Sequence, residues 1–108
     1  EKTFDETMAV KLVNAMALEE VVIHGAGMAA AADKKTYRSV QGITVQSPVI
    51  LTGAGDNFNA GYCLGKLCGF DIVLCLYLAD ISASIYVQRG FSADIDAIIT
   101  HIEHFLLV

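Results

Sequence analysis

The chain has 108 residues, the size of one domain, and a formal net charge of −5 without a basic stripe, which argues against a nucleic-acid-binding surface. Hydrophobic residues make up 55% of it and charged residues only 18%, so a protein this small must expose an unusually apolar surface. We therefore expect either that the chain is part of a larger protein, which its start at Glu1 without a Met or a signal-like segment favours, or that a partner covers an apolar face, as in a homo-oligomer.

The three cysteines, Cys63, Cys68 and Cys75, are odd in number and lack C-x-x-C spacing. Neither a disulfide framework nor a zinc site is therefore expected. Buried free thiols in a reducing cytosol are the simplest interpretation, and we expect a cytoplasmic location.

The N-terminal part of the chain alternates between helical and strand patterns. Apolar residues at helical spacing predict a first helix over about Asp5–Ala17. Thr3 or Asp5 could cap this helix. Short β-branched or apolar runs predict strands at Val21–Ile23, Met28–Ala32, Thr36–Val40 and Ile43–Val45, with turns at His24–Gly27 and Asp33–Lys35.

The C-terminal part is expected to be helical, with helices at Asn57–Cys68, Asp71–Gln88 and Ala93–Leu107. Gly61 and Gly65, spaced i, i+4, give the first of these helices a smooth face for close packing or for a ligand. Ser92 could cap the last.

The apolar run Ile72–Val87 requires a comparison with a membrane span. It contains Asp80, Ser82 and Ser84, and it is shorter than the roughly 20 residues that cross a bilayer. A buried helix, apolar on nearly all sides, is therefore expected instead. The elements follow the order helix, strands and three helices, and a strand that leads through a Gly-rich turn into a helix indicates an α/β fold with the site at the carboxyl ends of strands.

The stretch Pro48–Tyr62 combines an apolar run, a Gly-rich turn and a helix start. Gly53 and Gly55 would allow backbone N–H groups to approach an anion closely, and Asp56 would lie where the helix dipole favours negative charge. The pattern is neither a Walker A loop nor a full GxGxxG motif. Taken alone, it leaves two interpretations open, a phosphate site and a purely structural turn.

A carboxylate beside such a cradle has a specific chemical use. The N–H groups could hold the oxygens of a transferring phosphoryl group, where charge spreads in the transition state. The carboxylate of Asp56 could accept the proton of an attacking hydroxyl.

The string TGAGDNFNAG, Thr52 to Gly61, resembles the second signature of the ribokinase-like (PfkB) carbohydrate and nucleoside kinases, whose pattern is close to D-T-x-G-A-G-D-x-F. Val21–Gly27 is similar to the strand and Gly turn upstream of that signature. Leu78–Ser84 resembles the helix that borders the adenine pocket, and Val87–Gly90 resembles the segment after it. The resemblance covers about residues 19 to 104.

The resemblance implies a ribokinase-like three-layer αβα fold and ATP-dependent phosphoryl transfer to a hydroxyl of a sugar or nucleoside, with magnesium. Because family members are much longer, residues 1–108 would form only the C-terminal, nucleotide-binding portion of a larger kinase domain. The sugar site, the lid strands and the magnesium-associated Asn-x-x-Glu motif belong to the remaining N-terminal part of the kinase. This chain alone is therefore not expected to phosphorylate a sugar.

The resemblance also implies roles for residues in three places. Asp56 would be the catalytic base, and the anion hole would be formed by the Asp56 amide with Gly53, Ala54 and Gly55. The nucleotide phosphates or ribose would lie near Gly25 and Gly27. The adenine would lie near Ala79, Asp80 and Ala83.

The chain departs from the family pattern at several positions. Ile50 and Leu51 stand where an Asp and a Thr help bind a monovalent cation in ribokinases, so potassium activation is not expected. Asp80 replaces a common Asn, and the turn Gly25-Ala26-Gly27 is one residue shorter than Gly-x-x-Gly. These departures leave an alternative open, a non-catalytic or divergent relative that serves as a weak nucleotide-binding or assembly domain.

Other polar and aromatic residues have a structural and a functional interpretation. The group His101, Glu103 and His104 is a solvated helix face or an incomplete metal site. His24 is a strand end or a nucleotide contact, and Lys66 is a surface charge or a phosphate contact. The tyrosines within helices, Tyr62, Tyr77 and Tyr86, are expected to be core or interface aromatics rather than a base-stacking platform.

Overall fold

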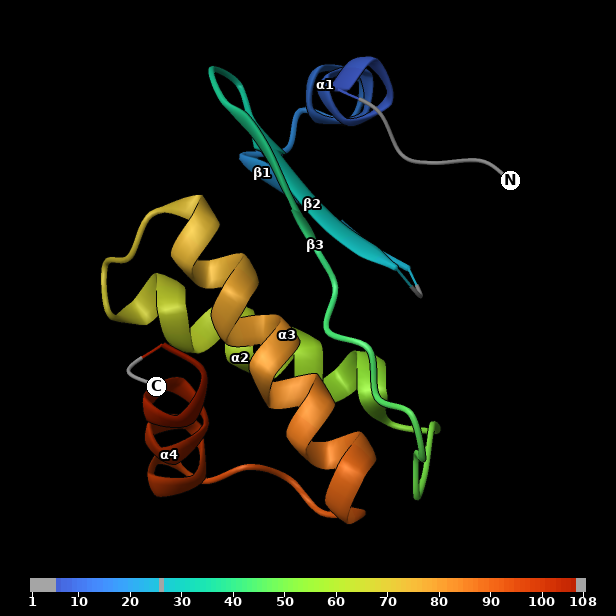
Figure 1. Ribbon diagram of the computed structural model, residues 1–108. Helices are drawn as coiled ribbons and strands as arrows, with labels where there is room; N and C mark the ends of the chain where they lie inside the picture. The colour runs from blue at the N-terminus through green and yellow to red at the C-terminus, as the bar shows by residue number, and fades with distance from the viewer. Residues whose placement is uncertain (1–5, 26, 107–108) are drawn as a thin grey trace. The chain divides into compact units, whose positions relative to one another are not determined.

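The computed structural model describes residues 6–25 and 27–106. Within them the chain forms two compact units that divide between Gly42 and Ile43. The first unit holds one helix and three strands, and the second holds three helices (Figure 1). In chain order the elements are α1 (Glu6–Ala15), β1 (Glu20–His24), β2 (Met28–Asp33), β3 (Tyr37–Gln41), α2 (Ala54–Leu67), α3 (Ile72–Arg89) and α4 (Ile95–Leu106).

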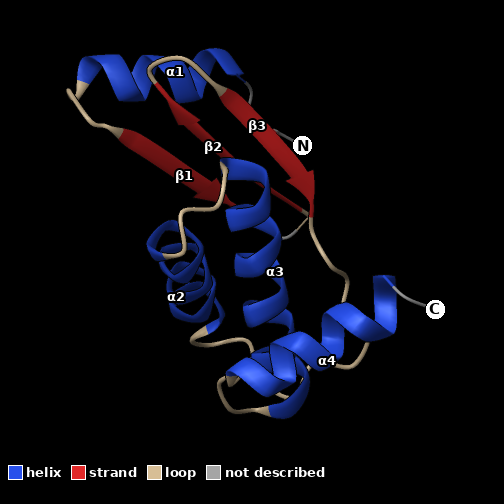
Figure 2. Ribbon diagram, turned by 90° about the vertical axis from the view of Figure 1, so that its left-hand side faces the viewer, coloured by secondary structure: helices blue, strands red, loops and turns tan. Residues whose placement is uncertain are grey.

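The first unit is an antiparallel sheet of order β1-β2-β3 with α1 across one face (Figure 2). Val21 pairs with Ala32 and Ile23 with Ala30, so these side chains share a face of the sheet. Ala9 and Val13 of α1 pack with Ala32 in a buried cluster that Val21, Ile23 and Tyr37 surround. The alanine run of β2 contributes little volume, which lets the helix lie close to the sheet.

The polar turn expected at Asp33–Lys35 is present, and its carboxylate holds it. Oδ1 of Asp33 accepts hydrogen bonds from the amides of Lys35 at 2.8 Å and Thr36 at 2.7 Å. This is the Asx-turn pattern that Asp favours between strands. The Gly turn between β1 and β2 is closed by the Gly25 amide, which donates to the Met28 carbonyl at 2.9 Å.

The second unit is centred on a helical hairpin of α2 and α3, and α4 packs against α3. The two helices meet at Gly61 and Gly65. A Cβ atom added to Gly61 would lie 2.6 Å from Oγ of Ser82, and one added to Gly65 would lie 2.8 Å from Sγ of Cys75. Close packing, one of the two roles expected for this glycine pair, is therefore its role in the helical hairpin.

The segment that leads into α2 differs from the sequence prediction. No strand is formed at 43–45, and residues 42–53 are irregular within the described chain. The amide of Val49 instead donates to the carbonyl of Val87 in α3 at 2.8 Å. The prediction of a strand at 43–45 is therefore wrong, and the chain before α2 is held by a hydrogen bond to α3 instead of by strand pairing.

Two helix starts also differ from the prediction. α2 begins at Ala54 instead of Asn57, so Asp56 lies within its first turn. Oδ1 of Asp94 accepts from the amide of Ala97 at 2.8 Å, so Asp94 caps α4 instead of Ser92. The predicted caps of α1, Thr3 and Asp5, lie outside the described residues.

Burial is less complete than the apolar sequence predicts. Cys75 is buried, but Cys63 and Cys68 are exposed, so the prediction of buried thiols is wrong for these two free cysteines. Leu74 and Tyr77 leave about half of their surface exposed on α3, which is therefore not buried on all sides. By length and composition alone α3 could cross a membrane, but its packing on α2 matches the core helix of a globular fold.

The contact between α2 and α3 can be tested with Gly61→Ala. The added Cβ would meet the carbonyl oxygen of Leu78 at 2.7 Å and Cα of Ala79 at 2.9 Å. Backbone atoms cannot rotate away, so the helices must separate, and we expect a loss of roughly 1–3 kcal/mol in the free energy of unfolding in urea. Asn59→Ala, at an exposed position of the same helix, is the matched control. Equal stability of the two variants would contradict the close contact.

Candidate active site

The turn before α2 depends on a glycine. Gly53 is the N-cap of the helix and adopts φ 97°, a left-handed conformation that residues with a Cβ rarely adopt. Its carbonyl accepts from both the amide of Asn57 at 3.1 Å and Nδ2 of Asn57 at 2.9 Å. The amide of Ala54 donates to the carbonyl of Leu51 at 3.1 Å, which closes the turn.

Tyr86 of α3 is the second structural support of this turn. Its hydroxyl donates to the carbonyl of Thr52 at 2.6 Å. A Cβ on Gly53 would lie 2.6 Å from the same hydroxyl, so the ring end occupies the space beside Gly53. Sequence reasoning placed Tyr86 among the core aromatics and missed this contact, because no local spacing signals a pair 34 residues apart.

The first turn of α2 offers hydrogen-bond donors to an anion. The amides of Gly55 and Asp56 occupy the second and third positions of the helix, where no intrahelical carbonyl is available. The side chain of Asp56 is exposed at the same helix end. The predicted anion hole and the predicted base therefore lie together at the positive end of the helix dipole, an arrangement suited to binding a phosphoryl group beside a carboxylate.

The three residues predicted to lie near adenine are on α3, and they differ in exposure. Ala79 has no exposed surface and lies against Gly61 of α2. Asp80 and Ala83 are half-buried. One carboxylate oxygen of Asp80, Oδ2, is buried without a hydrogen-bond partner among the described residues. Burial raises the pKa of Asp80 from 3.8 to about 6.

The residues predicted near the nucleotide phosphates or ribose lie in the first unit. Gly25 and Gly27 are exposed in the turn between β1 and β2. Ala26 lies outside the described residues. His24 is exposed at the end of β1, in agreement with its structural interpretation as a strand end.

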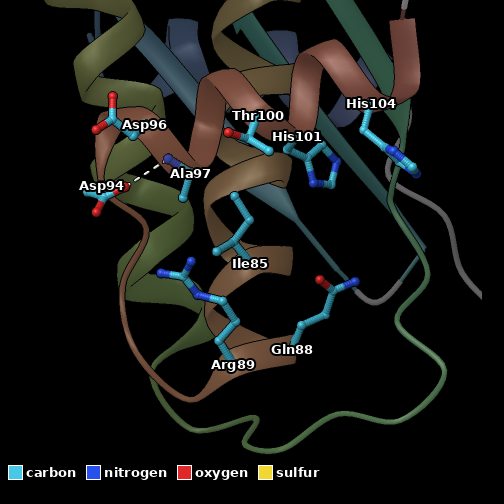
Figure 3. A pocket seen from close by; sticks show the side chains of 9 residues that line it. All are labelled: Ile85, Gln88, Arg89, Asp94, Asp96, Ala97, Thr100, His101 and His104. Carbon is cyan, nitrogen blue, oxygen red and sulfur yellow. Dashed lines mark hydrogen bonds between the residues drawn. The ribbon is translucent and has the colours of Figure 1, made fainter. Parts of the chain in front are cut away.

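A separate pocket of about 460 Å³ lies between the end of α3 and α4 (Figure 3). His101 and His104 line it from α4, and Arg89 lines it from α3. The Arg89 guanidinium lies 4.2 Å from the centre of the Phe91 ring and donates to the carbonyl of Ser92. Partial burial, and then the charge of His104, lower the pKa of His101.

No group of three or more His, Cys, Asp or Glu side chains that could hold a metal ion occurs among the residues that the structure describes. Glu103 and His104 are exposed, which supports the structural interpretation of this helix face.

The buried carboxylate of Asp80 predicts a pH dependence of stability. Because the folded pKa lies above the unfolded one, the protonated form stabilises the fold at low pH, and this contribution is lost as the pH rises through about 6. Asp80→Asn has a neutral side chain at every pH. The difference in thermal midpoint between this variant and the unmodified protein should therefore grow in favour of the variant from pH 4 to pH 8. The control is Asp96→Asn, an exposed charge removal on α4. A difference for Asp80→Asn that stays constant with pH would contradict the effect of burial.

Solved structures of ribokinases share the fold of this chain over part of their length. A candidate ribokinase II from E. coli in its apo form matches 96% of this chain with a TM-score of 0.79 and 22% identity. A ribokinase from Thermotoga maritima matches 91% with a TM-score of 0.78 and 18% identity. The E. coli protein in complex with ATP and Mg²⁺ matches 92% with a TM-score of 0.73 and 23% identity.

The chain spans about a third of the length of these structures, covering 35%, 34% and 37% of them in the same order. A search of curated proteins found no match. The family model of the prokaryotic ketohexokinases matches residues 1–105, nearly the whole chain. The chain therefore belongs to the prokaryotic ketohexokinase family, among the ribokinase-like (PfkB) kinases.

Proposed function

We propose that the chain is the C-terminal, nucleotide-binding portion of a larger αβα kinase domain, which transfers the γ-phosphoryl group of ATP to a hydroxyl of a sugar or nucleoside. The observation that carries this proposal is the exposed carboxylate of Asp56 beside the open amides of the first turn of α2. The name of the matching family makes a ketohexose the first acceptor to test. The share of the ribokinase structures that the chain covers supports a portion of a domain.

In this proposal the amides at the start of α2 stabilise the charge that develops on the transferring group. Gly53, Gly55 and Asp56 supply these amides, whereas the Ala54 amide already donates to Leu51. Rigid donors aimed at developing charge lower the barrier more than they strengthen ground-state binding.

Asp56 acts as the general base. Its carboxylate takes the proton of the attacking hydroxyl, whose oxygen forms the new bond to phosphorus while the bond to the ADP oxygen breaks. The half-buried surfaces of Asp80 and Ala83 and the exposed Gly25 and Gly27 remain the proposed contacts to adenine and to the phosphates or ribose. Ala79, which has no exposed surface, would act there only by shaping the helix.

Magnesium, when bound, would neutralise phosphate charge. Magnesium is generally held by one or two carboxylates together with substrate phosphates. Among the described residues no three potential ligands cluster. We propose that the ion is held chiefly by ATP and by the N-terminal part of the kinase, the partner of this chain. A cytoplasmic location is part of the same proposal, and the free thiols of Cys63 and Cys68 support it.

The alternative is a non-catalytic relative, and Asp80 favours it. The half-buried carboxylate of Asp80 has one oxygen without a hydrogen-bond partner in the described part of the chain, and its charge close to the proposed adenine contacts would weaken nucleotide binding. Calorimetry of Mg·ATP with the full-length protein separates the two functions. Micromolar to millimolar binding with turnover supports the kinase, and no detectable binding supports the alternative.

The general-base role predicts the effect of Asp56→Asn in the full-length protein. The amide keeps the shape of the side chain but cannot accept the hydroxyl proton, so kcat should fall by roughly 10²–10⁴-fold. The Kd for Mg·ATP in calorimetry should change little. The control is Asp96→Asn, an exposed carboxylate of α4, which should leave kcat unchanged. Turnover of Asp56→Asn at the control rate would exclude this carboxylate as the base.

We also expect turnover to be independent of potassium. The side chains of Ile50 and Leu51 carry no oxygen ligands, and the carbonyl of Thr52 already accepts the Tyr86 hydroxyl. Initial rates should therefore agree when KCl is replaced by tetramethylammonium chloride at constant ionic strength. A several-fold loss of rate without potassium would show that a cation site forms despite these residues.

A further inference from the structure

The hydroxyl of Tyr86 is the side-chain contact that joins α3 to the peptide before the candidate anion site. We propose that Tyr86 is a positioning residue, which aims the Gly53 amide at the transferring phosphoryl group by holding the carbonyl of Thr52. This inference rests on the proposed phosphoryl transfer for its chemistry. Its geometry rests only on contacts within the second unit.

The planarity of the peptide bond links the two groups. No cis peptide bond occurs in the described chain, so the Thr52 carbonyl and the Gly53 amide point to opposite sides of one rigid plane. A hydrogen bond of 2.6 Å from Tyr86 to that carbonyl therefore fixes the direction of the amide. The Tyr86 hydroxyl thus orients the Gly53 amide through the Thr52 carbonyl, without contacting the amide itself.

The conformational freedom of Gly53 is the reason why the peptide before it needs a contact that fixes its orientation. A glycine has a wide choice of backbone conformations, so the plane before it can rotate unless something holds it. The carbonyl after it is already held by Asn57, through both the backbone amide and Nδ2. Tyr86 holds the plane on the other side. The two contacts together define both peptides of the turn.

The fit between Tyr86 and Gly53 is mutual. A Cβ on Gly53 would lie 2.6 Å from the hydroxyl oxygen, 3.1 Å from Cζ and 3.3 Å from Cε2 of the ring. The absence of a side chain at position 53 thus gives the hydroxyl its access to the carbonyl. The Val49 amide, which donates to the Val87 carbonyl at 2.8 Å, brings the same loop to the same end of α3.

The test is Tyr86→Phe in the full-length protein, with Tyr77→Phe as the matched control. Tyr77 is on the same helix with 47% of its surface exposed. Phe keeps the ring and loses only the hydroxyl, so both variants should fold, as checked by circular dichroism and thermal midpoint. For Tyr86→Phe we expect a fall in kcat of about tenfold, less than the 10²–10³-fold cost of removing such a donor outright. The KM for ATP should stay within about twofold of the unmodified value.

A second readout is independent of activity. In ¹⁵N relaxation without nucleotide, the Gly53 amide should be rigid in the unmodified protein and in Tyr77→Phe, with an order parameter of about 0.85. It should fall toward about 0.6 in Tyr86→Phe. A rigid Gly53 amide in Tyr86→Phe, or a kcat equal to that of Tyr77→Phe in an active protein, would overturn the positioning role. If the unmodified protein shows no turnover, the proposed function fails, and the order parameter alone then decides whether Tyr86 holds the turn.

Discussion

The close approach of α2 and α3 is the constraint on which the candidate site depends. Gly61 and Gly65 remove the side chains that would keep the helices apart, and Ser82 and Cys75 fill the space at the contact. Because α3 is one continuous helix, its contact with α2 also determines the position of its last turns. Those turns carry Tyr86, which reaches the carbonyl of Thr52 before α2. Packing in the middle of the helical hairpin therefore determines the geometry at one end of it.

The second unit gathers the predicted anion-binding elements, and it does so largely with backbone groups. A helix dipole and open amides need only a correctly shaped turn, which Gly53 and Asn57 provide. The exposed Asp56 adds a carboxylate that can accept a proton at the same helix end. Under the proposed function, this portion of the kinase would bind the phosphoryl donor while another portion presents the acceptor.

The sequence predicted those features that local chemistry determines. The Asp33 turn, the glycine pair of α2 and the helix start near Asp56 all follow from short-range rules. The strand predicted at 43–45 is not formed within the described chain, because an apolar run alone does not supply a strand to pair with, and the nearby amide of Val49 donates to the carbonyl of Val87 in α3. The contact of Tyr86 with the carbonyl of Thr52 could not be predicted from local patterns either. It joins residues 34 positions apart, and only the packed hairpin brings them together.

The pairing of Gly53 with Tyr86 also bears on how relatives of this chain can diverge. The hydroxyl occupies the space that any larger residue at position 53 would need. A larger residue at position 53 would meet both the Tyr86 ring and a left-handed backbone conformation, and loss of the hydroxyl alone leaves the ring and the backbone conformation in place. The glycine should therefore be retained even in relatives that have replaced the tyrosine.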